Sequence, residues 1–576
     1  MYILGLNAYH ADSSAAIFKD GKMIAATEEE RFRRVKHWAG FPSMAVEFCL
    51  KEAGITLSQV DHIAIGRDPY AKLAKKILFL AKNPGGGWRA VTDRLQNAKK
   101  VASLEQEFKA LDKTIDEEAL KKRIHQVEHH RSHLASAFFA SPFEEAALLS
   151  IDGSGDFTTT MIATGKGNRI EVLDSVDFPH SVGLMYTAFT QLLGFPHYGD
   201  EYKVMGLAPY GKPEYVEKIR DVLIFKSNGL FELNLKYFRS AKSGIISYGE
   251  DHIPVVAPLF SQYMTEKFGA ARQKDEPLTQ YHKDLAASVQ RITEELIFHI
   301  LGYLHKKTGL ENVCIAGGVA QNSVANGKLT RNTPFRNIYI PSAGHDAGIS
   351  MGAALFVHNQ VLNQPRAEAV WSAYTGSRFS NEEIEKYLQS RNIAYTRYPD
   401  EELYDKVTER LIDAGVIGWF NGRAEFGPRA LGARSILADP RRLDAKDLLN
   451  SKIKRRESFR PFAPSILKEY VGEYFEVTDE VPFMEKVFPI RAEKRALIPA
   501  VTHADGTGRL QSVDSTVSPR YYLLIEAFRK KTGVPILLNT SFNENEPIVN
   551  SPEQALECFL RTSMDMLVLE NCVITR

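Results

Sequence analysis

The sequence predicts an α/β protein of two or three domains, with an internal duplication in the first domain. A chain of 576 residues is too long for one hydrophobic core. Residues 2–27 and 147–176 share one plan, in which a strand leads through a small polar turn into a returning strand. Strands then alternate with helical patterns over residues 312–358, which is typical of an α/β domain.

The composition indicates a globular protein without an overall electrostatic field. Hydrophobic residues make up 44% of the chain and aromatic residues 10%, while the formal net charge is only +1. The four cysteines form no CxxC pair and lie in apolar contexts, which predicts buried free thiols in a reducing compartment. No run reaches transmembrane length, and the N-terminus lacks a basic signal region. We therefore expect a cytoplasmic protein with no nucleic-acid partner and no membrane partner.

The first hairpin unit contains a histidine in its polar turn. Strands are expected at residues 2–7, 15–18 and 23–27, and the turn AYHADSS between the first two carries His10. Backbone N–H groups and hydroxyls in such a turn can face an anion. A loop histidine is commonly just solvated, but it can also act as a general base, so position alone leaves both roles open for His10. A helix at 43–53, closed by Gly54, and a strand at 62–66 follow.

A possible metal site begins at the next strand. Residues 124–127 form a short strand that leads into a helix starting at His129. His129 and His133 are four residues apart, so both imidazoles project from one helical face. The buried strand at 147–151 ends on Asp152. Two imidazoles and a carboxylate suit a divalent metal, although two histidines at this spacing are often only polar groups on a helix.

Two loops that follow strands extend this site. Gly317 and Gly318 follow a strand at 312–316 and precede a helix, which favours backbone binding of a nucleotide's phosphate or sugar. Asp346 follows a strand at 337–340 and could close the metal cluster opposite the two histidines. The remaining helices expected in this domain lie at 278–308, from residue 320, and at 350–358.

A polar segment separates the two predicted domains. Residues 359–370 contain proline and no periodic apolar pattern, which indicates a linker between a domain at 1–358 and a second α/β domain at 371–576. The first elements expected in the second domain are helices at 381–391 and 402–414 and a strand at 416–420.

The second domain carries a concentrated positive charge. Residues 423–460 hold eleven Lys or Arg against five Asp or Glu, a net charge of +6. Arg429 and Arg434 are interleaved with Gly, Pro and Ala, which favours a polyphosphate pocket over a solvated basic face. Further contacts to an anion or a hydroxyl are expected from Arg509, Ser541 and Asn543.

Nine segments, in this order along the chain, resemble the O-carbamoyltransferases of the nodulation and antibiotic-tailoring type, and the resemblance runs from about Tyr2 to Glu570. They are EEERFRRVKHWAGFP, HHRSHLASAFF, LLSIDGSGD, GDEYKVMGLAPYG, GGVAQNSVANGKL, GPRALGARSILADPR, RESFRPFAPS, HADGTGRLQSV and NTSFNENEPIV. This resemblance implies a duplicated actin-like (ASKHA-type, TsaD-like) first domain that bears a metal and a YrdC-like second domain that binds ATP. Such a pair resembles a fusion of two domains used in threonylcarbamoyl-tRNA synthesis.

The resemblance also implies a two-step reaction. In the C-terminal domain, carbamoyl phosphate and ATP, the latter with Mg(II), would give carbamoyl-adenylate with release of phosphate and pyrophosphate. In the N-terminal domain, a hydroxyl of a small-molecule natural product would attack the carbamoyl carbon and release AMP. A divalent metal, with iron(II) as the expected ion, would polarise the mixed anhydride.

Residue roles follow from the same resemblance. The metal would be held by His129, His133, Asp152 and Asp346. His10 would orient or deprotonate the acceptor hydroxyl. ATP and carbamoyl phosphate would be held by Arg429, Lys454, Arg460, Arg509 and Ser541, with Asn543 beside them, and Lys454 would neutralise charge as the anhydride forms. The adenylate in the first domain would be held by Gly317, Gly318 and Asn322, with Lys203 facing the same cleft.

Two other functions are compatible with parts of the pattern. A threonylcarbamoyl-type enzyme acting on tRNA would share the domains, but the near-neutral chain has no basic arm outside the ATP pocket. A non-enzymatic nucleotide-binding scaffold with a structural metal would leave His10 unexplained. The sequence does not identify the acceptor.

Overall fold

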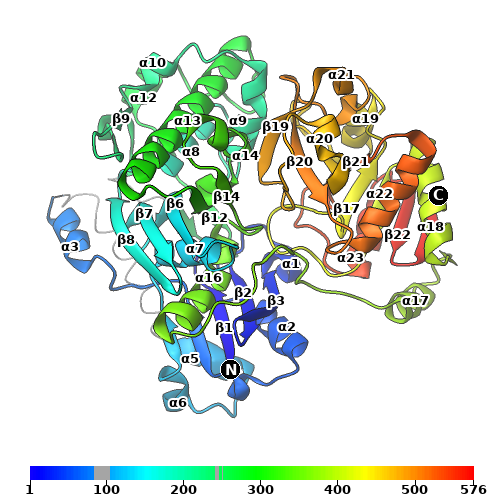
Figure 1. The fold of residues 1–576 in the computed structure, drawn as a ribbon, viewed down its shortest axis with the longest axis horizontal. Helices are drawn as coiled ribbons and strands as arrows, with labels where there is room; N and C mark the ends of the chain where they lie inside the picture. The colour runs from blue at the N-terminus through cyan, green and yellow to red at the C-terminus, as the bar shows by residue number, and fades with distance from the viewer. Residues whose placement is uncertain (83–103, 241–245, 250) are drawn as a thin grey trace. The chain divides into compact units, whose positions relative to one another are not determined.

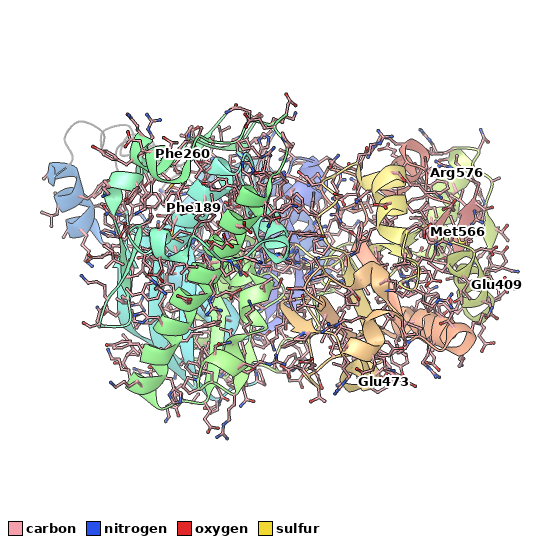
Figure 2. All side chains as sticks on the ribbon, turned by 90° about the horizontal axis from the view of Figure 1, so that it is seen from above. Phe189, Phe260, Glu409, Glu473, Met566 and Arg576 are labelled. Carbon is pink, nitrogen blue, oxygen red and sulfur yellow. The ribbon has the colours of Figure 1, made fainter. Side chains whose placement is uncertain are left out.

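The chain folds into two compact units (Figure 1). A computed structural model describes residues 1–82, 104–240, 246–249 and 251–576. The first unit comprises Met1–Ala325 and Leu329–Val370, and the second comprises Asn326–Lys328 and Trp371–Arg576. Each unit has its own apolar interior, and Figure 2 labels a buried side chain of each, Phe189 in the first and Met566 in the second.

The first sheet of the first unit has the strand order β3-β2-β1-β4-β5. Its strands are β1 (Tyr2–Asn7), β2 (Ser14–Lys19), β3 (Lys22–Glu28), β4 (His62–Ile65) and β5 (Ile124–Gln126). The first three strands form an antiparallel meander, joined by residues 8–13 and 20–21, and β4 and β5 add in parallel after longer connections.

The second sheet repeats this plan with the order β14-β13-β6-β7-β8. Its strands are β6 (Glu145–Gly155), β7 (Thr158–Lys166), β8 (Arg169–Asp177), β13 (Asn312–Ala316) and β14 (Asn337–Tyr339). Again a three-strand meander leads, and two parallel strands extend it from the side of the first strand. The predicted duplication is therefore confirmed, and the unit has the actin-like (ASKHA-type) arrangement.

Two helices, α7 (His129–Phe138) and α16 (Ile349–Phe356), pack against each other between the two sheets (Figure 1). Helix α16 lies against β1, β2 and β4, and α7 lies against β6, β7 and β13. Both helices are buried along almost their whole length, which explains the small and apolar residues of α16 and of the second half of α7. This layering brings the start of α7 and the loop before α16 to the ends of β1 and β6.

Further helices cover the outer faces of the first unit. They are α1 (Glu30–Arg33), α2 (Ser43–Ala53), α3 (Leu73–Lys82), α5 (Leu104–Leu111), α6 (Glu117–Lys121), α8 (Val182–Leu192), α9 (Glu201–Leu207), α10 (Val216–Ile219), α12 (Gln262–Phe268), α13 (Gln280–Thr308), α14 (Ser323–Asn326) and α15 (Leu329–Asn332). Two short hairpins are formed by β9 (Leu223–Phe225) with β10 (Phe231–Leu233) and by β11 (Ile246–Tyr248) with β12 (Pro254–Val256). Across the described ranges, no helix combines the length and apolar character needed to cross a bilayer.

The segment predicted as a linker, residues 359–370, is bound to the first unit. Its first residues continue helix α16 as the π-helical turn Val357–Val361, so the helix ends later than expected. Arg366 then donates hydrogen bonds to the carbonyls of Phe138, Ser141 and Phe143. Proline and polar residues in this segment therefore mark an extended strap held by a half-buried arginine, and only the end of the strap leads into the second unit.

The second unit is built on a nine-stranded mixed sheet with the order β15-β23-β22-β16-β17-β21-β18-β20-β19. Its strands are β15 (Thr396–Arg397), β16 (Ile417–Phe420), β17 (Arg434–Ala438), β18 (Ala463–Leu467), β19 (Lys486–Pro489), β20 (Thr507–Val513), β21 (Ile536–Ser541), β22 (Met566–Leu569) and β23 (Cys572–Thr575). Its helices are α17 (Asn381–Ser390), α18 (Asp400–Ile412), α19 (Ala445–Leu449), α20 (Val471–Tyr474), α21 (Ala492–Arg495), α22 (Pro519–Thr532) and α23 (Pro552–Arg561). The predicted elements at 381–391, 402–414 and 416–420 match α17, α18 and β16 to within two residues.

Candidate functional site

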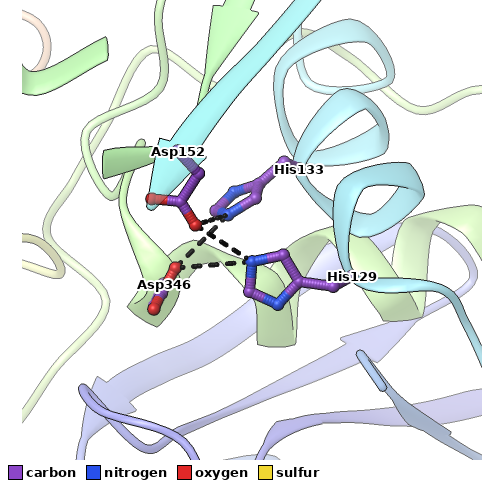
Figure 3. A group of neighbouring side chains, drawn as sticks. All are labelled: His129, His133, Asp152 and Asp346. Atoms are coloured by element: carbon purple, nitrogen blue, oxygen red, sulfur yellow. Dashed lines mark hydrogen bonds and ion pairs between the residues drawn. The ribbon is translucent and has the colours of Figure 1, made fainter. Parts of the chain in front are cut away.

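Two histidines and two aspartates converge in the interior of the first unit (Figure 3). The Nε2 atom of His129 lies 3.1 Å from Oδ2 of Asp152 and 3.7 Å from Oδ1 of Asp346. The Nε2 atom of His133 lies 3.6 Å and 3.3 Å from the same two oxygens. All four residues are buried. The four residues that the sequence suggested as metal ligands are therefore brought together, although 217 positions separate His129 from Asp346.

The start of helix α7 positions the two imidazoles. The Glu128 side chain caps the helix by accepting a hydrogen bond from the Arg131 N–H, and Asp156 accepts one from the His129 N–H. The four-residue spacing then places the imidazoles of His129 and His133 on the same face of α7. The ring of His129 rests on Gly155, where a Cβ atom would lie only 2.0 Å from its Cγ.

A bulge in β6 positions the first carboxylate. The strand was expected to end at residue 151, but it continues to Gly155 with an irregular register after Ile151, and Asp152 lies in this bulge. Bulges redirect side chains, and here the bulge lets one oxygen of Asp152 accept a hydrogen bond of 2.9 Å from the Gly318 N–H. Its other oxygen faces the two histidines.

The loop before α16 positions the second carboxylate and connects it to His10. Oδ1 of Asp346 faces His129 and His133, while its Oδ2 lies 2.8 Å from Nδ1 of His10. The turn that carries His10 is held by Asn7, whose amide donates to the carbonyls of Ala11 and Asp12. His10 therefore approaches the cluster from the first hairpin unit and contacts the carboxylate oxygen that faces away from the other two histidines.

Proton affinities in this cluster are strongly shifted. Burial alone would raise the pKa of Asp152, but His129 and His133 hold it well below its ordinary value. Burial opposes protonation of His133, yet Asp152 and Asp346 raise its pKa to about 9. For His10, burial likewise lowers the pKa, and the charge of Asp346 outweighs it and raises the pKa. The carboxylates are therefore ionised and acceptor-only, as ligands of a cation must be.

The geometry fits a bound divalent ion. Two ligand atoms each about 2.1 Å from one ion lie about 3.0 Å apart in octahedral and about 3.4 Å apart in tetrahedral coordination, close to the spacings seen here. Among the described residues, neither Nε2 of His133 nor Oδ1 of Asp346 has a hydrogen-bond partner, although both atoms are buried. Unsatisfied buried groups of this kind are costly unless something else coordinates them. A His₂Asp₂ donor set suits iron, manganese or zinc.

The predicted nucleotide contacts of the first unit take structural roles. Gly317 has φ +100°, and a Cβ atom there would lie 2.2 Å from the Ile151 carbonyl oxygen, so the turn needs glycine. The segment after it is a 3₁₀ turn, Gly318–Gln321, instead of the helix expected from residue 320. The Gly317 N–H donates to Gly344 and the Gly318 N–H to Asp152, so neither points at an open anion site. The Asn322 side chain is bonded to Gln290.

Lys203 lies in the first turn of α9. Its ammonium pairs with Asp200 at 2.9 Å and lies over the ring of Phe195. These contacts hold the side chain against its own helix start. That Lys203 faces the cleft of the adenylate stays a prediction.

Four arginines of the second unit lie close enough together for their charges to interact. Burial and the charges of Arg429, Arg456 and Arg460 lower the pKa of Arg509 to well below its ordinary value. Burial also lowers the pKa of Arg429, to about 10. Guanidiniums that are desolvated and repel one another are stabilised by a bound anion, and their planar donor pairs suit phosphoryl oxygens. The predicted anion contacts Arg429, Arg460 and Arg509 are thus neighbours.

Arg456 is a member of this group that the sequence interpretation did not single out. The signal was available in the +6 segment, because Arg456 stands two residues after Lys454 and four before Arg460. Arg434, by contrast, is fully buried away from the group: its guanidinium donates to the carbonyls of Ser377, Asn421, Gly422 and Ala433 and lies over Phe420. The expectation that Arg434 lines a polyphosphate pocket is therefore wrong, because the side chain is fully buried and both of its terminal nitrogens donate to backbone carbonyls.

Lys454, Ser541 and Asn543 form one connected cluster. The buried ammonium of Lys454 donates to the carbonyls of Ser541 and Asn543 and to the Asn543 side chain, each at 2.7 Å. The Ser541 hydroxyl also donates to Asn543, at 2.7 Å. Three strong acceptors satisfy the three donors of an ammonium group, so Lys454 holds the end of β21 in place in this structure.

Comparisons with known proteins agree with this division into units. A family model described as Carbamoyltransferase N-terminus matches residues 2–355, and one described as Carbamoyltransferase C-terminus matches residues 408–576. An uncharacterized protein of Synechocystis sp. is 43% identical, with 100% of this chain and 97% of that protein covered. Nodulation protein NolNO of Sinorhizobium fredii is 39% identical, with coverage of 99% and 80%.

A more distant relative is named for its activity. The 3'-hydroxymethylcephem-O-carbamoyltransferase of Amycolatopsis lactamdurans is 26% identical over 76% of this chain and 78% of that protein. Among solved structures, T. kodakarensis HypF aligns with a TM-score of 0.31 and 13% identity, over 63% of this chain and 48% of that one. The two family models together match nearly the whole sequence, in the order in which the two units follow each other. The chain is a carbamoyltransferase and belongs to the carbamoyltransferase family.

Proposed function

We propose that this carbamoyltransferase is an ATP-dependent O-carbamoyltransferase that acts on a hydroxyl of a small molecule. The name of one relative supports a hydroxyl acceptor, since that protein is a carbamoyltransferase for a hydroxymethyl group. The second unit would make carbamoyl-adenylate, and the first unit would transfer the carbamoyl group. No basic arm for a nucleic acid accompanies the arginine group in this near-neutral chain.

The observation that carries the proposal is the group of Arg429, Arg456, Arg460 and Arg509. Carbamoyl phosphate and ATP are both polyanions, and a chain of four guanidiniums can hold the two phosphate groups side by side. The reaction balances with one water: carbamoyl phosphate and water give carbamate and phosphate, and carbamate then attacks the α-phosphorus of ATP and displaces pyrophosphate. The arginines would stabilise the negative charge that develops on the phosphoryl oxygens.

In the first unit, we expect His129, His133, Asp152 and Asp346 to hold a divalent metal, with iron(II) as the expected ion. When bound, such an ion supplies Lewis-acid polarisation of the carbamoyl group. The protein's own contribution is geometric, because the capped start of α7, the bulge of β6 and the loop before α16 fix the four donor atoms before a ligand arrives.

His10 is the group in this cluster suited to move a proton. Its Nδ1 atom is held by Asp346, so the ring can present its other nitrogen to an acceptor hydroxyl. A carboxylate behind an imidazole stabilises the protonated ring, and this makes the imidazole a stronger base toward that hydroxyl. His10 would thus deprotonate the hydroxyl as it attacks the carbamoyl carbon, and AMP would leave.

The test is pyrophosphate release from ATP, measured with and without carbamoyl phosphate in the absence of an acceptor. Wild-type protein should release pyrophosphate only when carbamoyl phosphate is present, and Arg509→Ala should lose at least about 100-fold of this activity, because one phosphate-binding charge is gone. The control is Arg455→Gln, since Arg455 lies in the same basic segment but its side chain is 67% exposed. If pyrophosphate is released without carbamoyl phosphate, or if metal-loaded protein releases no pyrophosphate at all, this chain does not adenylate carbamate.

A further inference from the structure

A histidine beside the arginine group is not used by the reaction described so far. His503 begins the turn that leads into β20, with its N–H donating to the Thr507 carbonyl and its own carbonyl accepting from the Gly506 N–H. Thr507 and Arg509 are alternate residues of β20, so their side chains lie on the same face of the sheet. The His503 ring contacts Thr507, which places it on the face that carries Arg509.

The hydrogen bonds around His503 fix its tautomer. The Thr507 hydroxyl donates its hydrogen to the Asp505 carboxylate at 2.7 Å, because an ionised carboxylate can only accept. The same hydroxyl oxygen, 3.0 Å from Nδ1 of His503, must therefore accept from the ring. Nδ1 carries the hydrogen, and Nε2 of the neutral ring carries a lone pair.

The surroundings keep the ring neutral. Burial and the charges of Arg509 and Lys446, acting against that of Asp505, lower the pKa of His503 to about 4. At neutral pH the ring is thus uncharged, and its Nε2 atom is an acceptor among cations.

No described residue donates a hydrogen bond to Nε2 of His503. Nε2 of His503 is buried, and within the described parts of the chain it has no hydrogen-bond partner. A buried acceptor without a donor is unfavourable, so the position favours a ligand that brings an N–H or O–H group. Phosphate oxygens cannot serve, because they are acceptors themselves and are matched by the arginines.

We propose that Nε2 of His503 accepts a hydrogen bond from the amino group of carbamoyl phosphate and so determines which acyl phosphate the second unit takes. The assignment rests on the proposed function. Carbamoyl phosphate combines a phosphate with an NH₂ group a few bonds away, and the site combines guanidiniums with one neutral acceptor. Acetyl phosphate has the same shape with a methyl group in place of NH₂, and it would leave Nε2 unsatisfied.

The experiment compares wild type, His503→Leu and His503→Gln in the full chain. It measures the KM for carbamoyl phosphate and for ATP in pyrophosphate release, and the inhibition constant of acetyl phosphate in the same assay. Leucine removes the acceptor, so the KM for carbamoyl phosphate should rise about 5- to 10-fold, the effect of one hydrogen bond. The values for ATP and acetyl phosphate should stay unchanged, and glutamine, which keeps an acceptor atom, should restore part of the carbamoyl phosphate affinity.

Arg509→Ala is the comparison variant, because loss of a phosphate contact should weaken the binding of carbamoyl phosphate and of acetyl phosphate to the same extent. If His503→Leu weakens the binding of carbamoyl phosphate and of acetyl phosphate equally, His503 has a merely structural role and the assignment is overturned. A change only in the KM for ATP, or no change in any of these constants, would also overturn it. Wild-type protein that shows no carbamoyl-phosphate-dependent release would instead reject the proposed function, and this outcome is distinguishable because it needs no variant.

Discussion

Asp346 uses one carboxylate to contact His10 and the other two histidines: Oδ2 lies 2.8 Å from Nδ1 of His10, and Oδ1 faces His129 and His133. The two oxygens of one side chain thereby link the candidate metal cluster to the candidate base. A change at Asp346 should affect both, whereas a change at His10 should affect only one. Metal content and proton transfer can for this reason be separated by mutation.

Asp346→Asn should lose the metal. The amide removes the negative charge of a ligand, so affinity should fall by more than the about 10- to 100-fold that the loss of an outer-shell partner costs. Elemental analysis after dialysis against a weak chelator measures this. Asp275→Asn, at an exposed position of the same unit, serves as the control. Full metal occupancy in Asp346→Asn would mean that these four residues are not the site.

His10→Asn should keep the metal and lose transfer. The His10 ring contacts the outward oxygen of Asp346, so its removal leaves all four donor atoms in place. Loss of a general base costs about 10²- to 10⁴-fold in the step that it serves. Metal content and pyrophosphate release should match the wild type, while carbamoylation of an acceptor identified by screening falls by this factor. A variant that transfers at the wild-type rate would remove His10 from the mechanism.

Gly155→Ala should displace His129 and lower metal affinity at least about tenfold. A Cβ atom at Gly155 would lie 2.0 Å from Cγ of His129, which no real contact allows, so the ring must move. The control stands two residues away in the same bulge: Gly153 has open space where its Cβ would be, so Gly153→Ala should bind metal normally. Equal affinity in the two variants would show that the His129 ring can shift without consequence.

Lys454→Met should destabilise the second unit by about 2–4 kcal/mol, because it removes one buried cation together with the three hydrogen bonds that it donates to Ser541 and Asn543. Denaturant unfolding followed by a signal from the second unit measures this loss. Arg455→Gln, next in sequence but exposed, should change stability by less than about 1 kcal/mol. If Lys454→Met keeps full stability but loses pyrophosphate release, Lys454 contacts the substrates instead of holding β21.

Nδ1 of His37 lies 2.7 Å from Oδ1 of Asp12 in the first unit. This ion pair should stabilise the fold at intermediate pH and lose its effect in both acid and alkaline solution. Burial opposes the charge on His37, but Asp12 raises its pKa to about 9, so this stabilisation is complete below the ordinary histidine pKa and is lost as the pH rises through 9. The pKa of Asp12 is lowered despite burial, chiefly by His37, so its share is lost in acid.

Thermal unfolding across the pH range measures this contribution. The melting temperatures of wild type and His37→Gln should differ most between about pH 5 and 6.5 and converge above about pH 9. An Asp12→Asn variant completes a double-mutant cycle, and the coupling between the two changes should disappear at the same alkaline limit. A difference that is constant with pH would assign the effect to packing.

Local patterns in the sequence determined the duplicated hairpins, the start of α7 and the shared face of His129 and His133, because strand alternation, turn residues and helical spacing act over a few positions. They also indicated a basic pocket in the second unit. Only the tertiary structure decided how each basic side chain is used. Arg434 and Lys454 look like Arg429 in the sequence, yet their donors are used by backbone carbonyls that long-range packing brings to them. The bulge that aims Asp152, the contact between His10 and Asp346, and the unsatisfied nitrogen of His503 likewise depend on distances between segments, and no local periodicity encodes such distances.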